Sequence, residues 1–107
     1  MDERQVIDQM VKRIAEMFHP EKIILFGSMA RGEQTGDSDV DLLVIVKKVD
    51  DRRKLRIEIH RAVSGMGLPK DIAVLTVEEF ERKRGIPGTI AYPADHEGIV
   101  QYEAVPG

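Results

Sequence analysis

The chain is organised around FGSMARGE at residues 26–33 and SDVDLLV at residues 38–44. The first segment leaves an apolar run through a Gly-Ser turn, an arrangement that aims backbone N–H groups at a phosphate. The second begins a strand-like run. Because successive strand side chains alternate faces, Asp39 and Asp41 are expected to point the same way. A phosphate cradle beside a carboxylate pair is what nucleotide chemistry with magnesium needs.

Around these segments the sequence predicts alternating helices and strands. Hydrophobic periodicity and turn residues predict helices over 2–18, 52–66, 77–84 and 89–97, the last interrupted by Pro93, with a short helix from Met29 and a loop over 32–38. Strands are predicted over 22–26, 39–47, 70–75 and, at a sheet edge, 99–102. Strand 39–47 is apolar on both faces, which indicates a central strand covered on both sides. We therefore expect an α+β (α/β-like) fold, a small mixed sheet packed with helices, forming one domain over residues 1–107.

Composition narrows the class of protein. The chain has 107 residues, a net charge of −3 and no cysteine, which excludes disulfides, thiolate catalysis and thiolate zinc sites. The acidic balance argues against holding a long nucleic acid by bulk charge, so direct nucleic-acid binding is not expected. The longest aliphatic run, Leu42 to Val46, is too short to span a bilayer, and the charged N-terminus is unlike a signal peptide. We expect a cytoplasmic protein with no membrane partner.

Three carboxylates are candidate site residues: Asp39, Asp41 and Asp71 all stand at the starts of apolar strands. If strands 39–47 and 70–75 are neighbours, the three converge and would repel one another unless a cation sits among them. The alternative is that Asp39 and Asp71 only cap turns, which aspartate often does. For the pair Asp39 and Asp41 this alternative is weaker, because an inward strand carboxylate needs a partner.

The Gly-Ser turn supplies a second group of candidates. Gly27 permits close backbone approach, and the Ser28 hydroxyl with the following N–H groups could hold phosphate oxygens. Arg31 could reach the same phosphates in bidentate fashion, although a solvated side chain is an equal alternative. The basic cluster over residues 47–56 is interpreted as a solvated helix face rather than an RNA site, since no aromatic residues interleave with it.

Residues 27–33 and 38–44 together resemble the signature of the DNA polymerase β-like nucleotidyltransferase superfamily. The small size matches its minimal members, the MNT-domain proteins. Asp71 falls where the family carries its third carboxylate, although Lys70 replaces the usual preceding apolar residue. The ending over residues 97–103 also looks like the usual close of these domains. The resemblance implies the polymerase β-like nucleotidyltransferase fold.

By this resemblance the reaction is magnesium-dependent transfer of a nucleoside monophosphate, AMP from ATP, to a hydroxyl. Asp39, Asp41 and Asp71 would be the catalytic and metal-binding residues, with two Mg²⁺ ions, and Gly27, Ser28 and Arg31 would bind the nucleotide. Minimal proteins of this type pair with a HEPN-domain toxin, so the resemblance implies an antitoxin that modifies its partner with AMP. Two alternatives stay open: an antitoxin that acts by binding alone, and nucleotidyl transfer to RNA or a small molecule.

Overall fold

The computed structural model describes residues 2–33 and 38–106. Its helices are α1 (Glu3–Phe18), α2 (Ser28–Arg31), α3 (Arg52–Ala62), α4 (Val77–Lys83) and α5 (Ala91–His96). Its strands are β1 (Lys22–Phe26), β2 (Val40–Val46), β3 (Lys70–Thr76) and β4 (Ile99–Glu103). Most of the predicted loop, residues 34–37, lies outside the described residues.

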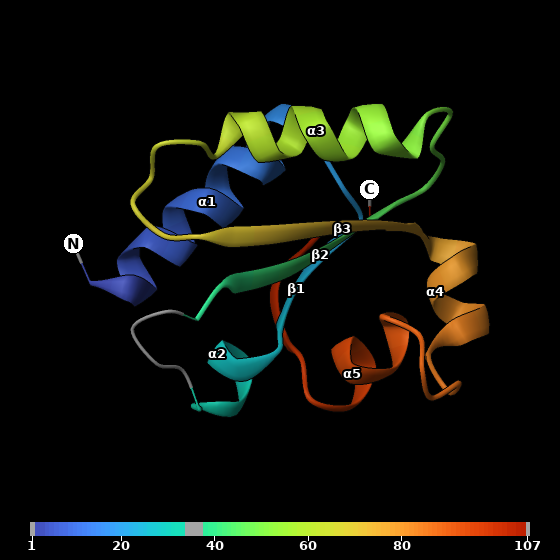
Figure 1. The fold of residues 1–107 in the computed structure, drawn as a ribbon. Helices are drawn as coiled ribbons and strands as arrows, with labels where there is room; N and C mark the ends of the chain where they lie inside the picture. The colour runs from blue at the N-terminus through green and yellow to red at the C-terminus, as the bar shows by residue number, and fades with distance from the viewer. Residues whose placement is uncertain (1, 34–37, 107) are drawn as a thin grey trace.

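The strands form one mixed sheet in the order β3-β2-β1-β4. β1 is antiparallel to β2 and to β4, whereas β2 and β3 are parallel and are joined by a crossover that contains α3. Helices α1 and α3 cover one face of the sheet and α4 and α5 the other (Figure 1). The predicted α+β fold with a mixed sheet and a central strand at β2 is confirmed.

Each face of β2 belongs to a different hydrophobic core. Val40, Leu42 and Val44 face the core built with α1 and α3, where Ile14 and Ile59 are fully buried. The alternate positions, including Leu43 and Ile45, face a smaller core closed by side chains of α4 and α5. This two-sided burial explains why the strand reads as a continuous apolar run. Asp41 shares the second face, so a carboxylate stands at the end of a buried row.

Local capping sets several helix boundaries. Asp2 accepts from the Gln5 N–H, Asp51 from the Lys54 N–H, and Thr76 and Glu79 complete a reciprocal capping box. The sequence predicts these caps, because Asp2 and Asp51 directly precede helical periodicity and Thr76 with Glu79 has the spacing of a capping box, and all three are confirmed.

Most predicted ends differ from the observed ones by one or two residues, as for α5, which covers Ala91–His96 rather than 89–97. Two differences have a clear physical cause. Helix α3 ends at Ala62 rather than Met66, because the chain then turns through Gly65 and Gly67, which both have positive φ. Strand β2 begins at Val40, whose N–H donates to the Pro69 carbonyl at 2.8 Å, so Asp39 lies outside the strand.

Pro93 does not break α5, because it occupies the first turn, where a missing N–H costs no intrahelical hydrogen bond.

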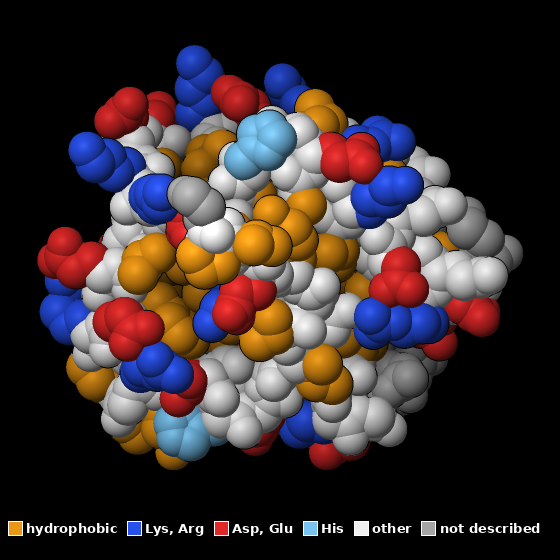
Figure 2. Space-filling view, turned by 180° about the vertical axis from the view of Figure 1, so that it is seen from behind, with side chains coloured by type: hydrophobic (Ala, Val, Ile, Leu, Met, Phe, Trp, Pro, Cys, Tyr) orange, Lys and Arg blue, Asp and Glu red, His pale blue; other side chains and the backbone are white. Residues whose placement is uncertain are grey.

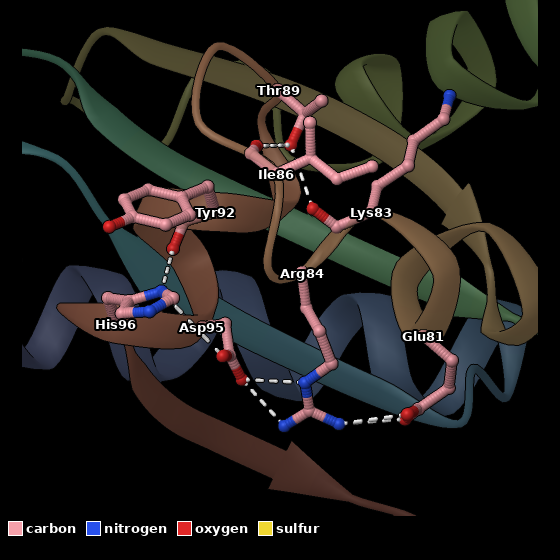
Figure 3. A network of polar contacts seen from close by, with 8 residues as sticks. All are labelled: Glu81, Lys83, Arg84, Ile86, Thr89, Tyr92, Asp95 and His96. Atoms are coloured by element: carbon pink, nitrogen blue, oxygen red, sulfur yellow. Dashed lines mark hydrogen bonds and ion pairs between the residues drawn. The ribbon is translucent and has the colours of Figure 1, made fainter.

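A polar network fixes α4 to α5 (Figure 3). Arg84 donates to Asp95 Oδ1 from Nη2 at 2.6 Å and from Nε at 3.0 Å, and to Glu81 Oε2 from Nη1 at 2.9 Å. The hydrogen bond from Arg84 lowers the pKa of Asp95. In the turn between the two helices, the Thr89 hydroxyl donates to the Lys83 carbonyl at 3.1 Å. These contacts tie α4, the turn and α5 to one another.

The sheet edge opposite β3 is formed by β4, where Ile99 and Val100 are about half exposed. Figure 2 shows the molecule from behind the view of Figure 1. Hydrophobic side chains lie near the centre of the visible face, and charged side chains lie mostly around them. Among the described residues, no helix has both the length and the apolar character needed to cross a bilayer.

We expect Gly98→Ala to lower the free energy of unfolding by about 1–3 kcal/mol, the usual cost of overpacking. Gly98 joins α5 to β4, and a Cβ there would overlap the Ala94 carbonyl oxygen and the Ile24 side chain. The control is Gly85→Ala, because that Cβ would meet no atom within 4 Å and the glycine does not have positive φ. Urea unfolding of both variants measures the difference. Equal stabilities would contradict the tight packing of α5 on β1.

Candidate functional site

Asp41 and Asp71 are direct neighbours on the parallel strands β2 and β3, where the sheet register pairs them. Paired residues on adjacent strands project to the same face, so both side chains stand on the face that α4 and α5 partly cover. The convergence predicted for strands 39–47 and 70–75 therefore holds for these two residues. Asp39 precedes β2 and is exposed, as is Asp71, whereas Asp41 is half-buried.

The electrostatics of the site centre on Asp41. Burial raises the pKa of its carboxyl group, and the nearby Asp71 and Asp39 raise it further. Arg31 opposes this shift, but it is the last and smallest of the four influences on the pKa. Ionisation of the Asp41 carboxyl group is therefore less favourable in the folded chain than in a free aspartate. A bound cation would offset the repulsion between the carboxylates.

Gly27 lies directly against the Asp41 carboxylate. It has φ of 77°, and a Cβ at this position would overlap Asp41 Oδ2. Phe26, the preceding residue, pairs with Asp41 in the antiparallel register of β1 and β2. The backbone of the Gly-Ser turn therefore approaches the acidic pair as closely as the absence of a side chain allows. Ser28 follows as the first residue of α2 and is partly buried.

Arg31 is engaged by carboxylates of this chain. Its Nε donates to Glu33 at 3.2 Å and its Nη1 to Glu97 at 3.1 Å, and these hydrogen bonds raise the pKa of the guanidinium. From the sequence, Arg31 was expected either to bind phosphate or to be a solvated side chain. In the structure it is exposed but forms ion pairs with both Glu33 and Glu97. A phosphate would have to displace one of these partners.

A cleft of about 510 Å³ opens beside the acidic pair. We call it the site cleft; its lining includes Phe26, Asp41, Asp71, Ile90, Arg52 and Arg56. Its volume is in the range of small-molecule sites. The two arginines were assigned to a solvated helix face from the sequence. Their spacing of four residues places them on one side of α3, but only the packing of α3 beside β3 shows that this side borders the cleft.

The donor set suits a hard divalent cation. Over residues 2–33 and 38–106, no three Asp, Glu or His side chains form a group that could hold a metal ion by themselves. Magnesium does not need such a cage, because it typically takes one or two carboxylates and completes its coordination with water and substrate phosphates. Asp41 and Asp71 fit that requirement. The ligand role of Asp39 stays a prediction.

Comparison with known proteins gives the following matches. A family model described as a nucleotidyltransferase domain matches residues 7–96. The chain is 40% identical over 68 residues to a candidate protein adenylyltransferase of Methanocaldococcus jannaschii, aligning 59% of this chain with 46% of that protein. It is 37% identical over 54 residues to another from the same organism, aligning 50% of this chain with 54% of that one. The chain thus spans about half the length of the curated relatives it matches.

Solved structures share the fold. A candidate nucleotidyltransferase from Sulfolobus solfataricus superposes with a TM-score of 0.66 at 22% identity, covering 92% of this chain and 78% of that chain. A mutant of the toxin–antitoxin MntA-HpeT gives a TM-score of 0.57 at 18% identity, with coverages of 97% and 75%. A toxin–antitoxin with AMP-PNP gives 0.58 at 16%, with coverages of 91% and 73%.

Proposed function

Because this chain belongs to the nucleotidyltransferase domain family, we propose that it transfers a nucleoside monophosphate from a nucleoside triphosphate to a hydroxyl group. The observation that carries the proposal is the pairing of Asp41 with Asp71 beside the site cleft, with Gly27 against Asp41. The names of the curated relatives favour AMP from ATP as the transferred group and a protein as the acceptor.

Asp41 and Asp71, with Asp39 beside them, are the proposed ligands of magnesium, with two ions in the full site. Bound magnesium would supply positive charge that neutralises the negative charge developing on the triphosphate. The Gly27–Ser28 backbone N–H groups and the Ser28 hydroxyl would hold phosphate oxygens beside the Asp41 carboxylate, against which Gly27 packs. Arg31 would join them by exchanging Glu33 or Glu97 for a phosphate oxygen.

Asp71 is the proposed base, because it is exposed and therefore accessible to an acceptor. It accepts the hydroxyl proton while the hydroxyl oxygen forms a bond to the α-phosphorus. The bond from the α-phosphorus to the bridging oxygen breaks, and pyrophosphate leaves with that electron pair.

The proposed acceptor is a HEPN-type toxin, which this protein would neutralise as an antitoxin in the cytoplasm. The toxin–antitoxin complexes among the structural neighbours support a toxin as the class of partner, and the neighbour with AMP-PNP supports a nucleotide ligand. Neutralisation by binding alone is the competing function. The close approach of Gly27 to the acidic pair favours catalysis, because a binding surface has no need of that contact.

Co-expression with the protein of the adjacent reading frame tests the proposal. We expect the parent to protect cells and to add the mass of one or more AMP units to the partner. Asp41→Asn should still bind the partner in a pull-down but neither protect nor modify it, because the substitution removes charge inside the cleft without reshaping a distant surface. Equal protection by parent and variant, with no mass change on the partner, would refute transfer in favour of binding alone.

A further inference from the structure

Five cations on α3 and at the start of β3 form no ion pair with a carboxylate among residues 2–33 and 38–106. Arg52, at the beginning of the same helix, pairs with Glu79 at 2.7 Å. The next cations along the chain form no ion pair with any residue in the described ranges: Arg53, Lys54, Arg56, Arg61 and Lys70. The acidic side chains close to them are few, and one of these, Asp51, is engaged as the cap of α3. In a chain of net charge −3, this is a local excess of positive charge.

Part of this excess lines a hollow of about 300 Å³, which we call the basic groove. Its lining includes Arg56, His60, Arg61 and Lys70, with Ile57 and Ile72 as apolar members. It shares Arg56, Asp71 and Ile72 with the site cleft. A ligand in the basic groove therefore lies beside Asp71, next to a ligand in the site cleft.

We infer that the basic groove docks the acceptor, and that the acceptor is an acidic protein segment carrying a hydroxyl group. The inference rests on the proposed function, in which Asp71 takes the hydroxyl proton. Two substrates must meet beside Asp71, and the two hollows share that residue. The nucleotide needs the hollow that contains both aspartates, and only the site cleft does. The basic groove is then left for the acceptor, and its charge selects an acidic one.

The groove lining favours a protein over RNA. Proteins that bind single-stranded nucleic acid combine cations with aromatic side chains on which bases stack. Among the described residues that line the basic groove, the only ring is His60, and the remaining surface includes the aliphatic Ile57 and Ile72. Aliphatic contacts beside cations suit a peptide with both acidic and apolar side chains.

The test uses two labelled synthetic peptides, each with one tyrosine and one serine, flanked by glutamates in one and by lysines in the other. We expect the parent, with Mg²⁺ and AMP-PNP, to bind the glutamate peptide more tightly. Arg61→Glu should raise the Kd for that peptide about fivefold, since charge reversal replaces an attraction with a repulsion, and should favour the lysine peptide. Arg61→Lys should keep the Kd of the parent. Lys12→Glu, at an exposed cation of α1 outside the groove, is the matched control.

Mass spectrometry of both peptides after incubation with ATP and Mg²⁺ separates the two proposals. Charge-selective binding that depends on Arg61 but adds no AMP would support the groove and count against the proposed function. AMP on both peptides at equal rates, unchanged by Arg61→Glu, would support the function and overturn the groove. Failure of both peptides to bind would also overturn it. A labelled RNA that binds more tightly than the glutamate peptide, and loses affinity in Arg61→Glu, would replace the protein acceptor with RNA.

Discussion

Asp41→Asn is expected to stabilise the folded protein at neutral pH while lowering the rate of nucleotidyl transfer more than about a hundredfold. The rate falls because Asp41 is a proposed magnesium ligand. Loss of a residue that only hydrogen-bonds to a metal ligand already lowers metal affinity or activity about 10- to 100-fold, and loss of the ligand itself should cost more. The fold gains because the substitution removes a half-buried charge whose ionisation is opposed by burial, Asp71 and Asp39. In the parent, Mg²⁺ with AMP-PNP should raise the unfolding temperature, and in Asp41→Asn this gain should disappear.

The stabilisation by Asp41→Asn should depend on pH in a defined direction. The pKa of Asp41 is raised above the ordinary value of 3.8, so the folded parent holds this proton more tightly than the unfolded chain does. The stabilisation of the fold by the protonated Asp41 carboxyl is fully present below the ordinary pKa of 3.8, and it is lost as pH rises through the raised pKa of the folded state. The difference in unfolding temperature between variant and parent should therefore be small near about pH 3 and grow toward about pH 7.

Asp39→Asn is the matched control for this effect. It makes the same chemical change two residues away, at an exposed position outside β2, where desolvation is small. We expect its effect on the unfolding temperature to be smaller than that of Asp41→Asn. A destabilised Asp41→Asn at neutral pH would show that the carboxylate is held by a favourable contact, and would contradict the electrostatic description of the site.

Features encoded within a few residues could be predicted from the sequence. Asp2, Asp51 and Thr76 were recognised as caps because the capping contact spans three residues. The two-sided burial of β2 followed from its unbroken apolar run. The resemblance drawn from residues 27–33 and 38–44 is confirmed by the family model over residues 7–96.

Contacts between distant segments could not be predicted in this way. Arg31 pairs with the nearby Glu33 and also with Glu97, 66 residues along the chain, and the second contact could not be inferred from the local sequence. The alternating side-chain pattern placed Asp39 at the start of the strand. In the structure β2 begins at Val40, whose N–H donates to the carbonyl of Pro69, a residue that is distant in the sequence. Arg56 resembled a solvated helix residue because its place beside Asp71 arises only when α3 packs next to β3. In each case the deciding partner comes from tertiary packing.

Gly27→Ala should be among the most destabilising single substitutions near the site, and it should also block nucleotide binding. The new Cβ would overlap Asp41 Oδ2 and lie 3.1 Å from Asp41 Cγ, and the φ of 77° disfavours any side chain. A side chain at this φ with ψ of −158° costs about 1–3 kcal/mol, and overpacking costs about 1–3 kcal/mol. We expect a total loss of about 2–6 kcal/mol in the free energy of unfolding, measured by urea denaturation.

Gly32→Ala measures the strain of a left-handed residue without any collision. Gly32 has φ of 72° and ψ of 20°, and a Cβ there would meet no atom within 4 Å, so only a strain of about 1–2 kcal/mol should appear. This is a lower bound on the backbone strain at Gly27, whose ψ of −158° places it in a region that is essentially restricted to glycine. A double-mutant cycle then measures the collision itself. In an Asp41→Ala background the Asp41 Cβ, at 3.4 Å, remains as an ordinary contact, so Gly27→Ala should cost about 1–3 kcal/mol less than it does in the parent. If Gly27→Ala costs as much in that background as in the parent, the loss comes from the turn alone, and Gly27 is not kept small by the carboxylate.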